Sequence, residues 1–238
     1  MGAIPRGWNS TRFTLPTWDL IYDEWLTLLA RRIYHPPRLI INLFMGYRDS
    51  MTIIEGPNGY SIGLVDDTMY NPDSSDNAVA YGRFYSEMPY KDYNFPTRHG
   101  ISLFKDGEVE KSVCICSSGG PTHIHARSSV LQDKRLLICC ADSVFCLAFP
   151  ALDLNWVTKA DQATCFGIFE HRDGYILHGE LEISRLDKDG RIIWQFSGPD
   201  IFTTLTGRDD FQLNGDVIEA STWDGTTFRI DAQTGQEL

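Results

Sequence analysis

Four stretches of this chain repeat one pattern of residues, and this repeat constrains the fold more than any other feature. In each, a short apolar strand runs into a turn, and in three of the four this turn is rich in polar residues and Gly. The stretches are 101–107, 144–156, 183–194 and 227–235. Their equivalent positions are Phe104, Leu147, Leu186 and Ile230, which lie 43, 39 and 44 residues apart. A period of about 40–45 residues built only of short strands is typical of β-propeller blades.

Each repeat predicts up to four strands. The clearest blade is expected at 164–170, 174–181, 183–187 and 191–196, with Gly190 supplying the positive φ of a tight hairpin. The neighbouring blade is expected at 123–130, 135–140, 144–147 and 154–157. The last blade is expected at 216–222 and 227–231. Leu238 then stands where an outer strand would begin, so we expect the N-terminal segment to complete that strand.

The N-terminal part is less regular. Residues 17–33 place apolar side chains on one face, acids early and arginines late, which predicts a helix. Strands are expected at 39–46, 51–55 and 60–65. Leu64 precedes Phe104 by 40 residues, which suggests a degenerate first blade and about five four-stranded blades in all.

The expected organisation is therefore all-β. It comprises an N-terminal segment with one helix (1–37) and a single propeller domain (38–238) that carries an insertion near 66–98. Long ordered loops are disproportionately functional.

The composition indicates the cellular compartment and the state of the cysteines. The chain shows no secretion signal at its start and no run of about 18 apolar residues, so a cytoplasmic protein without membrane insertion is expected. Six cysteines match no zinc spacing and are expected to be reduced, buried thiols. The adjacent Cys139 and Cys140 leave open the alternative of a ring disulfide at a cofactor site.

Charge is distributed unevenly. Residues 1–50 carry six Lys and Arg against four Asp and Glu, whereas residues 160–238 carry six against fifteen. This acidic half disfavours nucleic acid and favours a basic protein partner. The alternative is that Asp merely serves the blade turns.

The segments 184–194 and 224–235 resemble the pyrroloquinoline-quinone-like propeller repeat, which has a Gly-led strand, an Asp, a Thr-Gly turn and a strand closing on Trp. The resemblance covers about 100–238. It implies a propeller in which Trp194 wedges between sheets, at a cost of about 3–5 kcal/mol when changed to Ala. The calcium carboxylates and stacking Trp of the family's dehydrogenases have no counterpart here, so we expect no cofactor.

Candidate chemistry is sparse. His123 and His125 would share one face of a strand and could grip a metal, but no third ligand follows at useful spacing, so no metal site is expected. No catalytic residues are assigned. The residues expected to contact a partner are Arg208, Asp209 and Asp210 at a turn, Asp66 and Asp67 at the insertion, and His123 and His125.

Two functions remain open. The first is a non-enzymatic propeller that binds a protein partner, with the narrower hypothesis of a bacterial immunity protein that neutralises a toxin. The second is a carbohydrate-binding or hydrolytic propeller with its site at the mouth of the central channel.

Overall fold

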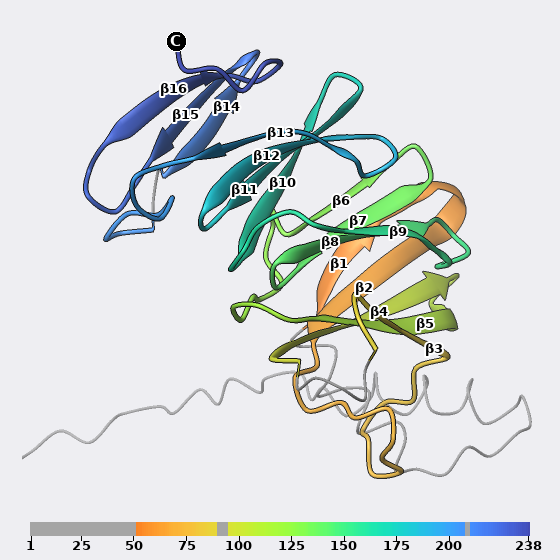
Figure 1. The fold of residues 1–238 in the computed structure, drawn as a ribbon. Coiled ribbons are helices and arrows are strands. Elements are labelled where there is room, and N and C mark those ends of the chain that lie inside the picture. The colour runs from red at the N-terminus through yellow and green to blue at the C-terminus, as the bar shows by residue number, and fades with distance from the viewer. Residues whose placement is uncertain (1–50, 90–94, 208–209) are drawn as a thin grey trace, which may run out of the picture. The chain divides into compact units, whose positions relative to one another are not determined.

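The computed structural model describes residues 51–89, 95–207 and 210–238 (Figure 1). All described residues belong to one compact unit, 46–238. The helix expected at 17–33 and the strand expected at 39–46 lie outside the described residues, as does any contribution of the N-terminal segment to the last sheet.

The first sheet of this unit is assembled from residues 52–117. Its strands in spatial order are β1 (Thr52–Glu55), β2 (Tyr60–Asp66), β4 (Thr97–Lys105), β5 (Glu108–Ser117) and β3 (Arg83–Ser86). Neighbouring strands are antiparallel except β3, which adds to the outer side of β5 in parallel. The segment between β2 and β4 therefore leaves the sheet after its second strand and returns one strand to its far edge.

Two further sheets each have four antiparallel strands in sequence order. The second sheet consists of β6 (Ser129–Gln132), β7 (Arg135–Cys140), β8 (Ser143–Ala148) and β9 (Leu154–Lys159). The third consists of β10 (Cys165–His171), β11 (Gly174–Gly179), β12 (Glu182–Asp187) and β13 (Ile192–Ser197). These bounds confirm the strands predicted for the clearest blade to within a few residues.

The fourth sheet has three strands, β14 (Phe211–Asn214), β15 (Val217–Ser221) and β16 (Thr227–Asp231). Beyond it, a single bridge pairs Glu237 with Ile230, and the Leu238 amide donates to the Arg229 carbonyl at 2.8 Å. The C-terminal residues thus contact β16 at the position that the repeat indicates for Leu238.

The repeat positions are structurally equivalent. Phe104, Leu147, Leu186 and Ile230 all lie on the third strand of a sheet. In three sheets the register between the third and fourth strands shifts at this residue, between Leu103 and Phe104, Cys146 and Leu147, and Arg185 and Leu186. A bulge at a fixed position sharpens the local twist, so the repeat encodes strand shape as well as strand spacing.

The expectation of five blades is wrong for the described residues, which form four sheets and no closed five-bladed ring. Leu64 lies on β2 and pairs with Ile101 of β4, so Leu64 and Phe104 belong to one sheet. The 40-residue spacing between them reflects the segment inserted between adjacent strands. The all-β class and the four-stranded antiparallel unit are confirmed.

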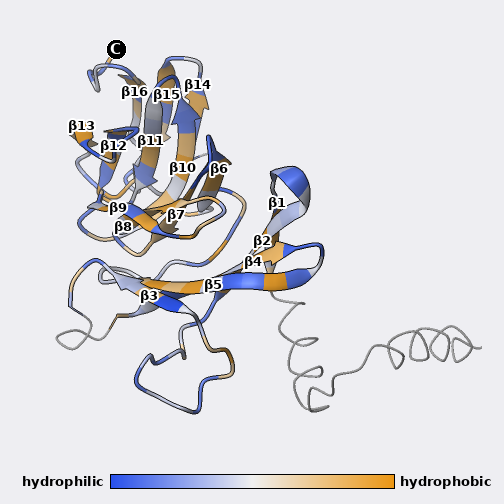
Figure 2. Cartoon of the chain, turned by 90° about the vertical axis from the view of Figure 1, so that its right-hand side faces the viewer, coloured by the Kyte–Doolittle hydropathy of each residue, from blue (hydrophilic) through white to orange (hydrophobic). Residues whose placement is uncertain are grey.

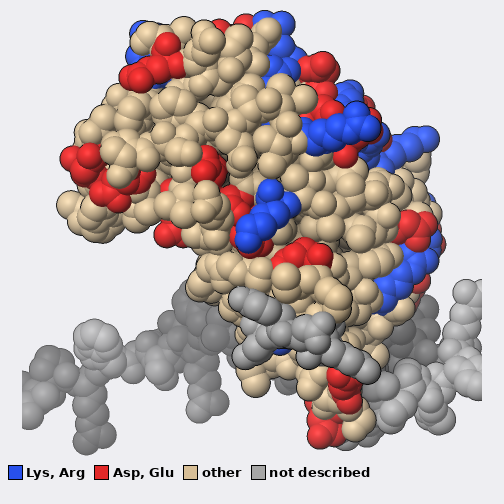
Figure 3. All heavy atoms as spheres, in the orientation of Figure 1, with Lys and Arg blue, Asp and Glu red and all other residues tan. Residues whose placement is uncertain are grey.

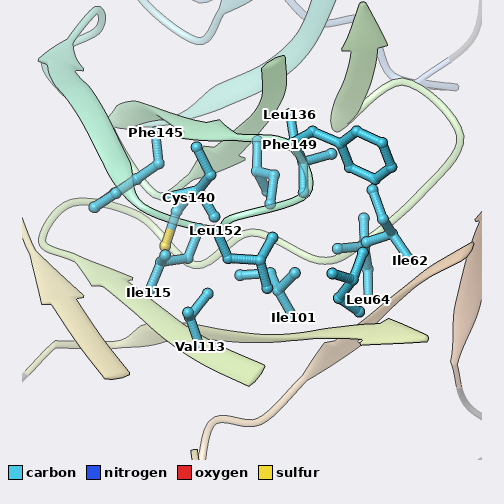
Figure 4. Packing of buried hydrophobic residues seen from close by; sticks show 13 residues of the cluster. Ile62, Leu64, Ile101, Val113, Ile115, Leu136, Cys140, Phe145, Phe149 and Leu152 are labelled. Atoms are coloured by element: carbon cyan, nitrogen blue, oxygen red, sulfur yellow. The ribbon is translucent and has the colours of Figure 1, made fainter. Parts of the chain in front are cut away.

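Three apolar clusters fill the spaces between successive sheets. The first joins residues of β2, β4 and β5 to residues of β7 and β8, and its side chains point toward one another in Figure 4. The second joins sheets two and three, and the third joins sheets three and four. Figure 2 shows the matching alternation of hydrophobic and hydrophilic residues along several strands.

Strand β7 contributes to two of these clusters because its side chains alternate between faces. Cys140 lies in the first cluster and Cys139 in the second, and both are free thiols with no exposed surface. All six cysteines are buried and free. Burial raises the pKa of the Cys116 thiol to about 12, which leaves it protonated and unreactive near neutral pH.

Two tryptophans each join a sheet to the next. Trp156 on β9 donates its indole N–H to the Lys188 carbonyl at 3.3 Å, and Trp194 on β13 donates to the Gln233 carbonyl at 3.1 Å. Each ring lies against a glycine with positive φ, Gly190 or Gly235, where a Cβ atom would come within 2.6 Å of the ring. The Trp of one repeat therefore packs against the Gly of the next, and the pair forms a contact between neighbouring sheets.

We expect Trp194→Ala to lower the free energy of unfolding by about 2–4 kcal/mol, because it removes both the ring packing and the indole hydrogen bond. The range lies below that for a fully buried aromatic, since Trp194 is only part-buried. Denaturant unfolding would measure it, with Trp223→Ala as control because Trp223 is 48% exposed. Equal stability of the two variants would contradict the assignment.

Between the first and second sheets a different contact takes this place. Lys111 pairs with Leu103 where the second and third sheets have Trp, and Leu152 occupies the turn position of the glycines. The inserted strand β3 supplies the contact instead. Tyr85 donates its hydroxyl to the Leu152 carbonyl at 3.3 Å, and Arg83 forms an ion pair with Asp153.

Candidate functional site

The connections at one end of the strands form a continuous rim. Hydrogen bonds link them from sheet to sheet: the Cys165 amide donates to Ala141 O at 2.7 Å, and the Phe202 amide donates to Glu180 O at 2.7 Å. We call the connections after β7, β9, β11, β13 and β15 the acidic rim. Their carboxylates are Asp142, Asp161, Glu180, Asp200, Asp210 and Asp224. Among the described residues these connections hold no Lys or Arg.

The turns at the other strand ends of the same three sheets, the opposite rim, have mixed charge. They hold Asp133, Asp153, Asp173, Asp189 and Asp216 together with Lys134, Arg172, Lys188 and Arg191. Figure 3 shows most Lys and Arg gathered toward one side of the molecule, while red patches with little blue lie on the other.

Several charges on the opposite rim are paired with one another. Arg172 forms an ion pair with Asp216, which also accepts from His171 Nε2 at 2.8 Å. Hydrogen bonds from Arg172 and then His171 hold the pKa of Asp216 well below its ordinary value.

The carboxylates of the acidic rim are mostly unbalanced by cations. Lys159, at the end of β9, lies 2.8 Å from the buried carboxylate of Asp142. The other five carboxylates of the rim form no ion pair with the residues that the structure describes. The rim therefore retains most of its negative charge.

Apolar side chains are exposed on the acidic rim. Trp223, in the β15–β16 turn, is 48% exposed, and Leu205, in the β13–β14 connection, is 82% exposed. The Trp223 amide donates to the Ile201 carbonyl at 2.9 Å, which fixes this turn against the preceding connection. An exposed Trp among carboxylates is a composition typical of the contact surfaces of proteins.

The structure brings some of the predicted contact residues together. Asp66, at the end of β2, lies 3.0 Å from His99 Nδ1 and 3.1 Å from His123 Nδ1, and accepts from the Ile124 amide. Burial works to raise the pKa of Asp66, but the hydrogen bond and charge interaction with His99, together with hydrogen bonds to the Ile124 amide and His123, outweigh it and lower the pKa. Asp67 accepts from the Tyr81 hydroxyl at 2.8 Å.

The expected placement of His123 and His125 on a strand is wrong. The first strand of the second sheet begins only at Ser129, and both histidines lie in the preceding connection. Asp66 accepts a hydrogen bond from the Ile124 amide, and Ser128 Oγ accepts one from the His125 amide. These backbone amides therefore bond to side chains and not to the backbone of a neighbouring strand. His123 therefore turns toward Asp66, while His125 lines a cavity.

That cavity, of about 850 Å³, lies between the inner strands β10 and β14. Its polar lining includes His125, Arg127, His178 and Asp210, and its apolar wall is formed by Phe166, Phe169 and Phe211. Asp210 accepts from Thr203 Oγ1 at 3.4 Å. Two residues predicted to contact a partner, His125 and Asp210, thus meet in one cavity although 85 positions separate them in the sequence. Arg208 and Asp209 lie outside the described residues.

Sequence reasoning missed Arg127 and His178, because neither belongs to a motif. His178 donates Nε2–H to the Phe202 carbonyl at 2.7 Å and stacks on Phe211 with ring centroids 4.7 Å apart. Burial is the main cause that lowers the pKa of His178; the Phe202 hydrogen bond and the charge of Asp210 oppose it.

This lowered pKa predicts acid sensitivity. The unfolded chain takes up a proton at His178 near pH 6.5, whereas the folded protein resists it, so stability falls as pH drops below that value. The slope is at most about 1.4 kcal/mol per pH unit. His178→Gln retains a neutral donor for the Phe202 carbonyl and should show a shallower loss of unfolding free energy between about pH 7 and 5.5. An unchanged slope in this variant would contradict the assignment, since every other histidine is retained.

Within 51–89, 95–207 and 210–238, no group of three or more His, Cys, Asp or Glu is placed to hold a metal ion. No helix in this part of the chain is long and apolar enough to cross a membrane.

Comparison with known proteins finds no matching family model and no matching curated protein. Among solved structures, BamB from Moraxella catarrhalis aligns at 15% identity with a TM-score of 0.44, over 58% of this chain. The chain spans 42% of the length of BamB. The computationally designed Ika4 protein aligns at 13% identity with a TM-score of 0.40, over 49% of this chain and 72% of its own. Neither match assigns the chain to a family.

Proposed function

We propose that this protein is a non-enzymatic, propeller-type scaffold of the cytoplasm that binds a basic protein partner through its acidic rim. The observation that carries the proposal is the contrast between the two rims. Among the described residues the acidic rim carries six carboxylates and no Lys or Arg, whereas the turns of the opposite rim carry five carboxylates and four Lys or Arg. Complementary charge steers a basic partner toward one face and raises its association rate.

The exposed apolar residues of the same rim support a protein partner over a small ion. Trp223 offers a large rigid surface beside Asp224 and the 198–207 connection. In interfaces a Trp surrounded by polar residues often carries much of the binding energy, while the charges set rate and orientation. The acidic rim supplies both parts.

An immunity protein is the narrower form of this proposal. A toxin that acts on nucleic acid needs a positively charged surface to contact the phosphates, and an acidic protein can neutralise the toxin by covering that surface. If the gene lies beside a toxin-like reading frame, co-expression should restore growth to cells that make the toxin.

The general proposal is tested by affinity capture from a cell extract with three forms of the protein. The parent is compared with a rim variant, Glu180→Gln with Asp200→Asn and Asp210→Asn, and with a control, Asp106→Asn with Asp133→Asn and Asp189→Asn. Both variants lose three negative charges. A basic protein retained by the parent and the control but not by the rim variant is the expected result. Equal retention by all three, or saturable turnover of a small molecule by the parent alone, would overturn the proposal.

A further inference from the structure

We propose that the cavity between β10 and β14 binds a small organic carboxylate, whose anionic group is held by Arg127 and His125 and whose apolar body lies against the phenylalanine wall. The cavity volume of about 850 Å³ lies within the usual range for small-molecule sites. This inference does not require the protein partner proposed for the acidic rim, although Asp210 belongs to both sites.

The Arg127 side chain is held in position, and none of the residues that the structure describes is a polar partner for its guanidinium. Its guanidinium lies over the Phe169 ring, 5.1 Å from the ring centroid. Its backbone carbonyl accepts from the Ile168 amide at 2.9 Å, which ties the residue to β10. With the residues that the structure describes, the guanidinium forms no hydrogen bond or ion pair. Its N–H donors at the cavity are therefore free to bind an anion as a fork.

His125 presents a second donor. Its Nδ1 accepts the Arg127 backbone N–H at 3.2 Å, so the proton of the neutral ring is on Nε2. The His125 amide is in turn held by Ser128 Oγ at 3.0 Å. An imidazole fixed in this tautomer offers an N–H donor from the same short segment as the Arg127 guanidinium. Two donors from one connection form the polar end of the site.

The wall of the cavity is aromatic and rigid. Phe169 and Phe211 have ring centroids 4.7 Å apart, and Phe211 stacks on His178 at the same distance. Phe166 meets the His178 ring edge to face at 5.3 Å. This row is well packed before any ligand enters, so little ordering cost opposes the binding of an apolar body.

Asp210 favours a singly charged anion over a doubly charged one. Its carboxylate lies in the same cavity, where it accepts a hydrogen bond from the Thr203 hydroxyl. A like charge disfavours a doubly charged phosphate more than a singly charged carboxylate. The planar carboxylate also matches the guanidinium fork. A monocarboxylate with an aromatic or aliphatic body therefore fits best.

The test uses 3-phenylpropanoate and its uncharged counterpart 3-phenylpropan-1-ol, with binding measured by calorimetry and by ligand-observed NMR. The carboxylate should bind with a dissociation constant in about the millimolar range, as expected for so small a ligand, and at least about tenfold more tightly than the alcohol. Phenyl phosphate should bind more weakly than the carboxylate. Asp210→Asn should reduce that difference.

Arg127→Gln should weaken carboxylate binding by about tenfold or more and leave the alcohol unaffected. Arg191→Gln is the matched control, because Arg191 is an exposed arginine of the opposite rim that loses the same charge. Equal binding of acid and alcohol, equal loss in both Arg variants, or no saturation up to about 10 mM carboxylate would overturn the proposal. Since no partner protein takes part, these outcomes are independent of the acidic-rim proposal.

Discussion

Replacing Asp161 with Ala is expected to lower the free energy of unfolding by about 3–5 kcal/mol, more than we expect from any other polar substitution in this protein. Asp161 is only 2% exposed. One carboxylate oxygen accepts the amides of Ala163 and Thr164 at 2.6 and 3.0 Å, and the other accepts those of Leu181 and Glu182 at 2.9 and 2.8 Å. Without the carboxylate, four backbone donors in a buried region lose their acceptor.

The position of Asp161 explains why its loss should destabilise the whole third sheet. It joins the connection that enters β10 to the turn between β11 and β12, and so holds the third sheet in shape at the acidic rim. Gly179 leaves room for this carboxylate, since a Cβ there would come within 2.2 Å of it. Natural domains are stable by only about 5–15 kcal/mol, so the loss is a large fraction of the total.

Denaturant unfolding checks the prediction, with Asp200→Ala as the control. Asp200 is an exposed carboxylate of the same rim that, among the described residues, accepts only the Ile201 amide, at 2.8 Å. Its removal should change stability by less than about 0.5 kcal/mol. Comparable losses in the two variants would mean that Asp161 does not organise the rim.

Much of the fold could be predicted because residues of the repeat are required by local turns and by packing between sheets. The turn at Gly190 and the pairing of Trp194 with a following glycine each have a packing reason that the sequence displays directly. The count of sheets could not be read in the same way. Spacing along the chain does not distinguish a new sheet from an insertion between two strands of one sheet, and the pair Leu64 and Phe104 shows this.

The candidate site was predicted less well, and the reason is again physical. A concentration of Asp in the C-terminal half was visible, but which strand end each Asp occupies depends on strand direction, which alternates from turn to turn. The cavity was not visible at all. His125, His178 and Asp210 come from three distant parts of the chain. Nothing in the sequence around Arg127 indicates a binding role, because its contact with the Phe169 ring is formed only in the folded structure.

We expect the acidic rim to affect the association rate of the partner more than any other functional property. At low ionic strength the rim variant, with Glu180, Asp200 and Asp210 neutralised, should bind its basic partner about tenfold more slowly than the parent. The control variant should associate nearly as fast as the parent, because its three substitutions lie in turns outside the acidic rim. Dissociation should change less, since exposed charges contribute little once the complex has formed.

The most direct test of partner recognition is the association rate of the purified partner, measured by stopped flow from low to high salt for the parent and the rim variant. As the Debye length falls to about 8 Å and below, screening removes long-range attraction. The parent rate should therefore fall steeply with added salt and converge on the rate of the rim variant, which should depend on salt much less. A parent rate that is indifferent to salt, or a rim variant that associates as fast as the parent at every ionic strength, would contradict the proposal that the acidic rim recognises the partner.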